Sequence, residues 1–249
     1  MNQVIHTLLN HRSIRKFTDR KLSQEQIHTI VKSAQQASTS SNVMAYSIIG
    51  VTDQNLKNEL YKVSGHTHVK NNAHMLLFCG DLHRINRLAN TEDNQQTIDN
   101  NLESTEQLIV ATIDAALAAQ NAAIAAESMG LGICYIGSLR NDIKRVNELL
   151  ELPGHVIPLF GLVIGYPDHN PEIKPRLPID SIYHENKYKP FAEQEQFIEA
   201  YDNEMRSYYG NRSSNTKLDT WTDQMIRKFS TPTRMDVTPF VKSKNLNKR

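Results

Sequence analysis

The sequence predicts a protein of mixed α and β structure, with one compact body followed by a C-terminal arm. Three observations support this prediction. Up to Tyr166, segments with helical periodicity alternate with short apolar runs that suit strands. An Ala-rich stretch over 108–129 contains neither Gly nor Pro. Beyond Pro175 the chain becomes polar and rich in tyrosine, which is typical of an arm rather than of a buried core.

The first half of the body is predicted to alternate between helix and strand. Ser23 begins a helix, because Gln26 stands three residues later as the partner of a capping box. Asp53 is the expected N-cap of a later helix. The elements expected here are a helix over 2–10, a helix from Ser23, a polar loop over 38–42, a strand over 46–51 and a helix over 54–63.

The second half of the body is built around the Ala-rich stretch, which predicts a long helix that is apolar nearly all round. Such a helix belongs in the centre of a protein or in a subunit interface. Its few polar positions are Asp114, Gln120, Asn121 and Glu127. The other elements expected in the body are a buried strand over 74–80, an irregular surface segment over 84–106, a strand over 133–136, a helix capped by Asn141 or Asp142 that runs to Leu150, and a strand over 156–166. The arm is expected to contain helical patches over 197–208 and 221–229 and an irregular basic tail.

Composition and charge limit the classes of partner. The 249 residues contain 28 Lys and Arg against 27 Asp and Glu, a formal charge of +1, so we expect neither nucleic acid nor an anionic membrane as partner. No run approaches the roughly 20 apolar residues of a spanning helix, and the N-terminus does not resemble a secretion signal. Two cysteines are too few for a disulfide framework. We therefore expect a soluble, cytoplasmic protein.

Cations cluster near the start of the chain, in the segment His11-Arg12-Ser13-Ile14-Arg15. A hydroxyl flanked by His and Arg side chains makes a good cradle for an anion, because Arg supplies forked donors and Ser a short one. The alternative is a solvated basic helix end that complements the helix dipole. Charge clusters are more often solvated surfaces, so spacing alone does not decide between the two.

A second basic cluster, Lys174-Pro175-Arg176, follows the last predicted strand. The prolines on either side stiffen the backbone, so the two cations lose little entropy when they are fixed. The alternative is a basic linker to the arm. Two basic clusters without a protein-borne nucleophile, and with no GxSxG, HExxH or P-loop motif, suggest that a bound cofactor carries the chemistry.

The segment Tyr135-Ile136-Gly137-Ser138 lies at the carboxyl end of a predicted strand, where α/β sheets present ligand sites. Glycine there lets a planar ligand approach the main chain. The alternative is an ordinary strand-to-helix turn. His66 and His68 lack a third ligand at metal-binding spacing, so we predict no metal site.

Taken in order, these motifs resemble one family. The segment His11–Arg15, the long Ala-rich helix, Tyr135-Ile136-Gly137, and Leu159-Phe160-Gly161 running to Lys174–Pro178 occur in this order in the nitroreductase superfamily. The chain is most similar to the NADPH-dependent flavin reductases and oxygen-insensitive major nitroreductases, in particular to the NADPH-FMN oxidoreductases of Gram-positive bacteria. The resemblance extends roughly from Val4 to Trp221.

The resemblance implies an α+β fold and a homodimer. The fold has a central mixed sheet surrounded by helices, with long helices packed across the dimer interface and two FMN molecules bound there. The resemblance also implies a division of the chain into an FMN-binding core, residues 1–178, and a C-terminal extension, residues 179–249. The extension would supply dimer contacts and a nucleotide-binding loop.

The resemblance also implies the roles of the FMN-binding residues. His11 and Ser13, with Lys174 and Arg176, would hold the phosphate, and Arg15 would lie beside the pyrimidine edge of the flavin. Main-chain groups around Gly137 would face N5, with Ser138 in place of a second Gly. The remaining residues of the expected FMN site are Arg12, Ile14, Thr39, His66, Tyr135 and Ile136. The segment after Gly65 is one residue shorter than in relatives, so His66, Thr67 and His68 all stay candidates for one flavin contact.

For the nucleotide, Arg212 matches the residue that binds the 2′-phosphate of NADPH in relatives, and Lys217 is a second candidate. The activity implied is ping-pong hydride transfer from NADPH through N5 of FMN to small planar acceptors such as flavins, quinones or nitroaromatics. Three alternatives stay open: a reductase with a dedicated acceptor such as a disulfide, a flavin-binding redox sensor, and a structural dimer without flavin.

Overall fold

The computed structural model describes residues 2–211 and 218–249, which form two compact units. The first unit comprises Met1–Pro171 together with Arg234–Arg249, and the second is Glu172–Thr233. The predicted division, 1–178 and 179–249, differs from these units in two ways. The first boundary lies after Pro171, and the last sixteen residues belong to the body rather than to the arm.

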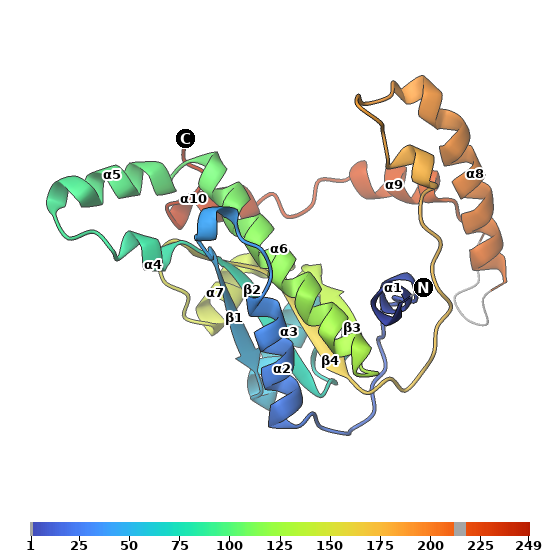
Figure 1. The fold of residues 1–249 in the computed structure, drawn as a ribbon, viewed down its shortest axis with the longest axis horizontal. Helices are drawn as coiled ribbons and strands as arrows, with labels where there is room; N and C mark the ends of the chain where they lie inside the picture. The colour runs from blue at the N-terminus through green and yellow to red at the C-terminus, as the bar shows by residue number, and fades with distance from the viewer. Residues whose placement is uncertain (1, 212–217) are drawn as a thin grey trace. The chain divides into compact units, whose positions relative to one another are not determined.

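A four-stranded sheet forms the centre of the first unit (Figure 1). Its strands are β1 (Tyr46–Val51), β2 (His74–Asp81), β3 (Gly132–Ile136) and β4 (Val156–Gly165), in the order β1-β2-β4-β3. All three pairings between these strands are antiparallel. A parallel pairing is present as a single bridge between Ser13 and Ile133. The α+β architecture predicted from the sequence is confirmed.

Strand β4 is irregular at Pro158. In the ladder between β2 and β4, Phe78 pairs with Phe160 and the next residue, Cys79, pairs with Pro158. Leu159 is therefore skipped and has no paired residue on β2. Proline lacks the N–H that a regular ladder requires, and a bulge accommodates this. The predicted strand over 156–166 is therefore present with a local irregularity where the sequence contains a proline.

Helices cover both faces of the sheet. Helices α2 (Gln24–Gln35) and α6 (Thr105–Ser128) pack on one face, where α6 crosses the strands and α2 lies beside it (Figure 1). Helices α3 (Gln54–Ser64) and α7 (Ile143–Leu149) pack on the other face. Successive residues of a strand face opposite sides, so Leu76 contributes to the α6 side of the core and Leu77 to the α3 side.

The predicted helix caps are present. The Ser23 hydroxyl accepts a hydrogen bond from the Gln26 amide at 3.1 Å, and the Gln26 side chain accepts one from the Ser23 amide at 3.0 Å, which completes the capping box of α2. Asp53 caps α3, and Asp142, one of the two candidates, caps α7. The first predicted helix is α1 (Gln3–Leu9), and short 3₁₀ segments lie at Ser40–Asn42, Thr67–Val69 and Gly137–Asp142.

Two segments predicted to be irregular are helical. The stretch 84–106 contains α4 (His83–Asn86) and α5 (Glu92–Leu102), the latter capped by Thr91. The basic tail forms α10 (Val237–Ser243), and its Leu246 is fully buried among residues of the body. The prediction of an irregular tail was wrong because the tail gains its order from tertiary packing.

Helix α6 is long and apolar enough to cross a membrane when only length and composition are considered, although the sequence showed no uninterrupted apolar run. Within the most apolar part of α6, 44% is buried inside the molecule. Its buried side consists almost entirely of alanine, which lets the helix approach the sheet and α2 closely. Core helices share this composition.

The second unit contains α8 (Phe191–Gly210) and α9 (Trp221–Phe229), with a 3₁₀ turn at Ile179–Ser181. Both helices were predicted as patches, and α8 is longer than expected. Tyr201, Met205 and Tyr209 of α8 form a small apolar cluster with Trp221 of α9. This cluster is separate from the core of the first unit and holds the second unit together.

Candidate functional site

The cationic segment near the N-terminus lies along strand β3. Ser13 bridges to Ile133, and the Ile14 amide donates to the Ile133 carbonyl at 2.8 Å. Ile14 is buried over Gly132, where an added Cβ would lie 2.6 Å from Ile14 Cγ1. A residue with a side chain at position 132 would therefore displace Ile14. This close approach fixes the backbone from Ser13 to Arg15 and leaves the Arg15 side chain exposed.

His11 and Arg12 are held by acceptors within the first unit. His11 Nδ1 lies 2.7 Å from Glu127 Oε1. Arg12 Nη1 donates to Asn170 Oδ1 at 2.7 Å, and Arg12 Nε donates to the Asn10 carbonyl at 3.1 Å. The orientation of both side chains is thus set by neighbouring groups.

Arg15 influences two buried groups, Cys134 and His68. Burial raises the pKa of the Cys134 thiol, and the positive charge of Arg15 opposes part of that rise. Burial lowers the pKa of His68 to about 4, with smaller contributions from His66 and Arg15. The His66 and His68 rings stack with centroids 5.3 Å apart and planes 15° apart. His68 is consequently neutral near pH 7, and of the three candidates in this segment it is the buried histidine beside Arg15.

Thr39 begins a polar loop that is held by helix α6. The Ser40 amide donates to Asp114 Oδ1 at 2.8 Å, and the Ala45 amide donates to Asp114 Oδ2 at 3.0 Å. Asp114 is fully buried. The loop is therefore fixed at both ends by one carboxylate.

The predicted segment Tyr135–Ser138 joins the end of β3 to the 3₁₀ turn at 137–142. The Tyr135 hydroxyl donates to Gln120 Oε1 at 3.4 Å, and its ring meets Phe160 edge-on with centroids 5.8 Å apart. Ile136 is buried in the core. Ser138 Oγ is buried and has no hydrogen-bond partner among the described residues. Buried polar atoms are rarely left unpaired, so the unpaired Ser138 Oγ is a notable feature of this turn.

Helix α6 supports three of the segments that the sequence singled out. Asp114 binds the loop after Thr39, Gln120 binds Tyr135, and Glu127 binds His11. The sequence identified these three residues only as rare polar positions in an apolar helix. Their roles as partners could not be read from the sequence, because each contact joins residues far apart in the chain.

Lys174 and Arg176 belong to the second unit. Arg176 Nη1 donates to the Lys174 carbonyl at 2.7 Å, and Lys174 Nζ lies 5.6 Å from the centroid of the Tyr209 ring. The Tyr201 hydroxyl donates to the Pro175 carbonyl at 3.0 Å. Helix α8 thereby orders this basic segment. Whether its cations join those of the first unit stays a prediction, and Arg212 and Lys217 lie outside the described residues.

Comparison with known proteins identifies the family. The model of the Nitroreductase family matches residues 8–166, and that of the Nitroreductase family C-terminal domain matches residues 174–249. The chain belongs to the nitroreductase family. It is 48% identical over 250 residues to the FMN reductase (NADPH) of Bacillus subtilis (strain 168), with 100% of both chains covered.

Two solved structures of this family are similar over nearly the whole chain. The structure of B. megaterium NfrA1 matches with a TM-score of 0.95 at 51% identity, covering 99% of this chain and 100% of that one. The NADPH:FMN oxidoreductase from Vibrio harveyi complexed with NAD+ matches with a TM-score of 0.87 at 39% identity, covering 100% of both. The α+β fold described above is therefore the fold of this family.

The groups present in the first unit are chemically compatible with FMN. A flavin needs hydrogen-bond donors and acceptors at its polar edge and cationic or hydroxyl groups at its phosphate. Arg15 is an exposed cation, Ser13 carries a hydroxyl on the same fixed segment, and Ser138 Oγ has no partner among the described residues. This donor set matches the cofactor that the sequence predicted.

Proposed function

We propose that this protein is an NADPH-dependent FMN oxidoreductase that reduces small planar acceptors. The main support is its match, along the whole chain, to relatives named FMN reductase (NADPH) and NADPH-flavin oxidoreductase. Further support comes from the cationic segment fixed against β3, which was expected from the sequence to bind FMN. Bound FMN supplies the redox chemistry, since it accepts a hydride from NADPH and passes the electrons on.

In this proposal the chain's own residues bind and orient the cofactor. His11, Ser13, Lys174 and Arg176 hold the phosphate. Arg15 lies at the pyrimidine edge, where its guanidinium stabilises the negative charge that reduction places on the flavin. The remaining FMN-binding residues are Arg12, Ile14, Thr39, His66 or one of its two neighbours, Tyr135, Ile136, Gly137 and Ser138.

The donor and acceptor sites differ in selectivity. Arg212, with Lys217 as a second candidate, binds the 2′-phosphate and makes NADPH the preferred donor, because charge-assisted bonds to a phosphate are strong. In this ping-pong scheme the acceptor would bind at the same site after NADP⁺ has left. A stacking slot selects by planarity rather than by many hydrogen bonds, so flavins, quinones and nitroaromatics all qualify.

The assembly that we propose is a homodimer. Ile109, Ile113 and Leu117 are spaced by four residues, so they lie on one face of α6, and they are 46%, 46% and 43% exposed. The apolar residues of α1 are exposed as well. An apolar face of this kind on a monomer indicates an interface with another protein surface, and a second copy of the chain would cover it.

The proposed location is the cytoplasm. Cys79 and Cys134 are both free and both buried. Unpaired cysteines are usual in proteins of reducing compartments, where NADPH is the common electron donor.

The proposal is tested by the visible spectrum of the purified protein and by the oxidation of NADPH and NADH with several acceptors. We expect bound FMN and a turnover above about one per second. Arg212→Ala should raise KM for NADPH about tenfold, as loss of a charge-assisted bond predicts, and should leave KM for NADH nearly unchanged. Arg206→Ala, an exposed arginine of α8 that binds Asn203, is the control.

Three results would contradict the proposal. Protein that cannot take up FMN would indicate a structural dimer. Tight FMN with turnover well below one per second would indicate a redox sensor. Activity with a disulfide acceptor alone would indicate a dedicated reductase.

A further inference from the structure

The loop from Thr39 to Tyr46 contains an unusual backbone. Ser41, Asn42 and Met44 have φ values of +46°, +59° and +51°. Residues with a side chain rarely adopt this left-handed region, because Cβ approaches the following carbonyl oxygen. Within the loop, the Val43 amide donates to the Ser40 carbonyl at 2.9 Å and the Tyr46 amide donates to the Met44 carbonyl at 2.8 Å. A strained conformation persists only when the surrounding structure also supports it, so bonds from outside the loop matter here.

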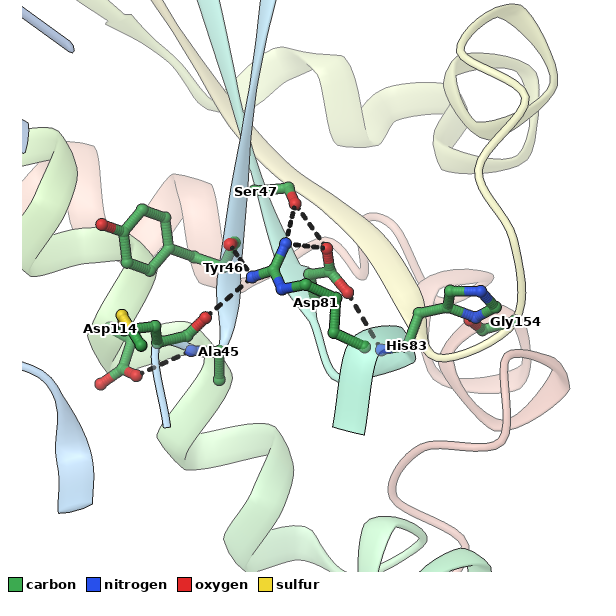
Figure 2. A network of polar contacts seen from close by, with 9 residues as sticks. Ala45, Tyr46, Ser47, Asp81, His83, Asp114 and Gly154 are labelled. Atoms are coloured by element: carbon green, nitrogen blue, oxygen red, sulfur yellow. Dashed lines mark hydrogen bonds and ion pairs between the residues drawn. The ribbon is translucent and has the colours of Figure 1, made fainter. Parts of the chain in front are cut away.

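Asp114 of α6 supplies two of these bonds. Its Oδ1 accepts from the Ser40 amide at 2.8 Å, and its Oδ2 accepts from the Ala45 amide at 3.0 Å (Figure 2 shows the contact with Ala45). The carboxylate thus binds one amide before the strained residues and one after them. Asp114 is 0% exposed, and a buried carboxylate is tolerated only when hydrogen bonds satisfy it.

Arg84 of α4 binds the C-terminal end of the loop, where Asp114 also binds the Ala45 amide. Arg84 Nη2 donates to the Met44 and Tyr46 carbonyls at 2.9 and 2.7 Å, and Arg84 Nη1 donates to Asp81 Oδ2 at 3.1 Å. Figure 2 shows this network around Tyr46, Ser47 and Asp81. One anion therefore binds the amides of the loop, and one cation binds its carbonyls.

Thr39 lies directly before the first amide that Asp114 binds. Its side chain does not cap the 3₁₀ turn that follows, and its hydroxyl makes no hydrogen bond within residues 2–211 and 218–249. A hydroxyl on a fixed backbone without a partner is available to a ligand.

We propose that Asp114 is a positioning residue for FMN: by binding the Ser40 and Ala45 amides it holds the loop so that Thr39 contacts the flavin. The inference rests on the proposed function, because it assumes that FMN binds beside this loop. It assigns a role to an internal acidic residue that does not touch the cofactor. Arg84 assists at the C-terminal end of the loop.

The first test is Asp114→Asn. The substitution keeps the size of the side chain but replaces one acceptor by an NH₂ group that faces a backbone N–H. We expect the Kd for FMN, measured by quenching of FMN fluorescence, to rise about tenfold. The matched control is Asn121→Ala on the same helix. It removes the 3.1 Å bond from Asn121 Nδ2 to the Ser33 carbonyl of α2, which does not involve the loop. Asn121→Ala should change Kd less than about twofold, even if both variants lower Tm.

A double-mutant cycle with Thr39→Val separates positioning from general destabilisation. If Asp114 acts through Thr39, the combined loss of FMN affinity is smaller than the product of the two single losses. Amide hydrogen exchange at Ser40 and Ala45 should speed up in Asp114→Asn and stay unchanged in Asn121→Ala. If Asp114→Asn does not fold, Arg84→Lys replaces it, with an expected rise in Kd of about threefold, because a lysine cannot bind both carbonyls with a fixed fork.

Unchanged FMN affinity in folded Asp114→Asn would overturn the inference, as would equal losses in Asp114→Asn and Asn121→Ala, or independent effects of Asp114 and Thr39. If Arg84→Lys is the variant used, an unchanged Kd would overturn it too. These outcomes differ from failure of the proposed function, in which the wild-type protein itself does not bind FMN.

Discussion

Two buried groups near Arg15, His68 and Cys134, are neutral near pH 7. Burial lowers the pKa of His68 to about 4, and burial raises the pKa of the Cys134 thiol, so neither carries a charge there. No carboxylate contributes to the pKa of either group. Neither group therefore offsets the positive charge of Arg15.

Replacing Arg15 tests this arrangement. Arg15→Ala should slow flavin reduction by NADPH about tenfold to a hundredfold, because the charge that stabilises the reduced flavin is lost, and Arg15→Lys should lose less. Stopped-flow absorbance of the flavin measures this rate. Arg20→Ala is the control, because Arg20 is not one of the proposed FMN-binding residues. Its guanidinium carbon lies 3.9 Å from the centroid of the Tyr166 ring. Equal rates in wild type and Arg15→Ala would show that Arg15 is misassigned.

His68 should make the protein less stable in acid. Its pKa is about 4 in the folded chain against 6.5 for an ordinary histidine, so between these values the unfolded state binds the additional proton. The free energy of unfolding should therefore fall as pH falls from 6.5 towards 4, by up to about 3 kcal/mol for this group.

Urea denaturation at several pH values measures this effect. His68→Gln should be less sensitive to pH than wild type in this range, whereas His28→Gln, at an exposed position, should match wild type. The same pH dependence in wild type and His68→Gln would show that another group is responsible.

At the scale of elements, the sequence predicted those features that depend only on residues close together in the chain. The caps at Ser23 and Asp53 and the strand over 46–51 were predicted, and Asp142 was one of two candidates for a third cap. A cap depends on residues three positions apart and a strand on the residue types within it. Helix α5 was missed because it has few apolar residues and buries only Leu102. Helix α10 was missed because Val241 and Leu246 pack against distant parts of the chain.

The close contact between β3 and the cationic segment depends on Gly132. Gly132→Ala should lower the free energy of unfolding by about 1–3 kcal/mol and weaken FMN binding, because a Cβ would lie 2.6 Å from Ile14 Cγ1 and push the segment off β3. Thermal denaturation and FMN titration measure both effects. Gly154→Ala is the control, since nothing lies within 4 Å of its added Cβ. Wild-type behaviour of Gly132→Ala would mean that this segment has room to move.

At the scale of the whole molecule, the sequence predicted candidate site residues but not the residues that support them. The segments around His11, Thr39 and Tyr135 were recognised by resemblance to a family. Their common support on α6 required long-range contacts, which no local pattern encodes. The placement of Lys174 and Arg176 beside the other cations, and the partner that covers α6, stay predictions.

The exposed face of α6 provides a test of the assembly. Ile113→Lys places a charge in the middle of the apolar face formed with Ile109 and Leu117, so it should convert the proposed dimer to a monomer at micromolar concentration. Sedimentation velocity measures the mass. Leu88→Lys changes an isolated exposed leucine and should leave the assembly unchanged. A dimer that tolerates Ile113→Lys would place the interface elsewhere.

The return of residues 234–249 to the first unit makes the second unit an insertion with two covalent connections. The chain leaves the body after Pro171, and it re-enters at Arg234 to bury Leu246. Lys244 Nζ anchors the returning segment on Asn147 Oδ1 at 2.8 Å and on the Leu152 carbonyl at 2.7 Å. A single proteolytic nick near residue 172 would thus leave the inserted unit tethered through its other end. An affinity tag attached after Arg249 would extend a segment that packs into the first unit and helps to stabilise it.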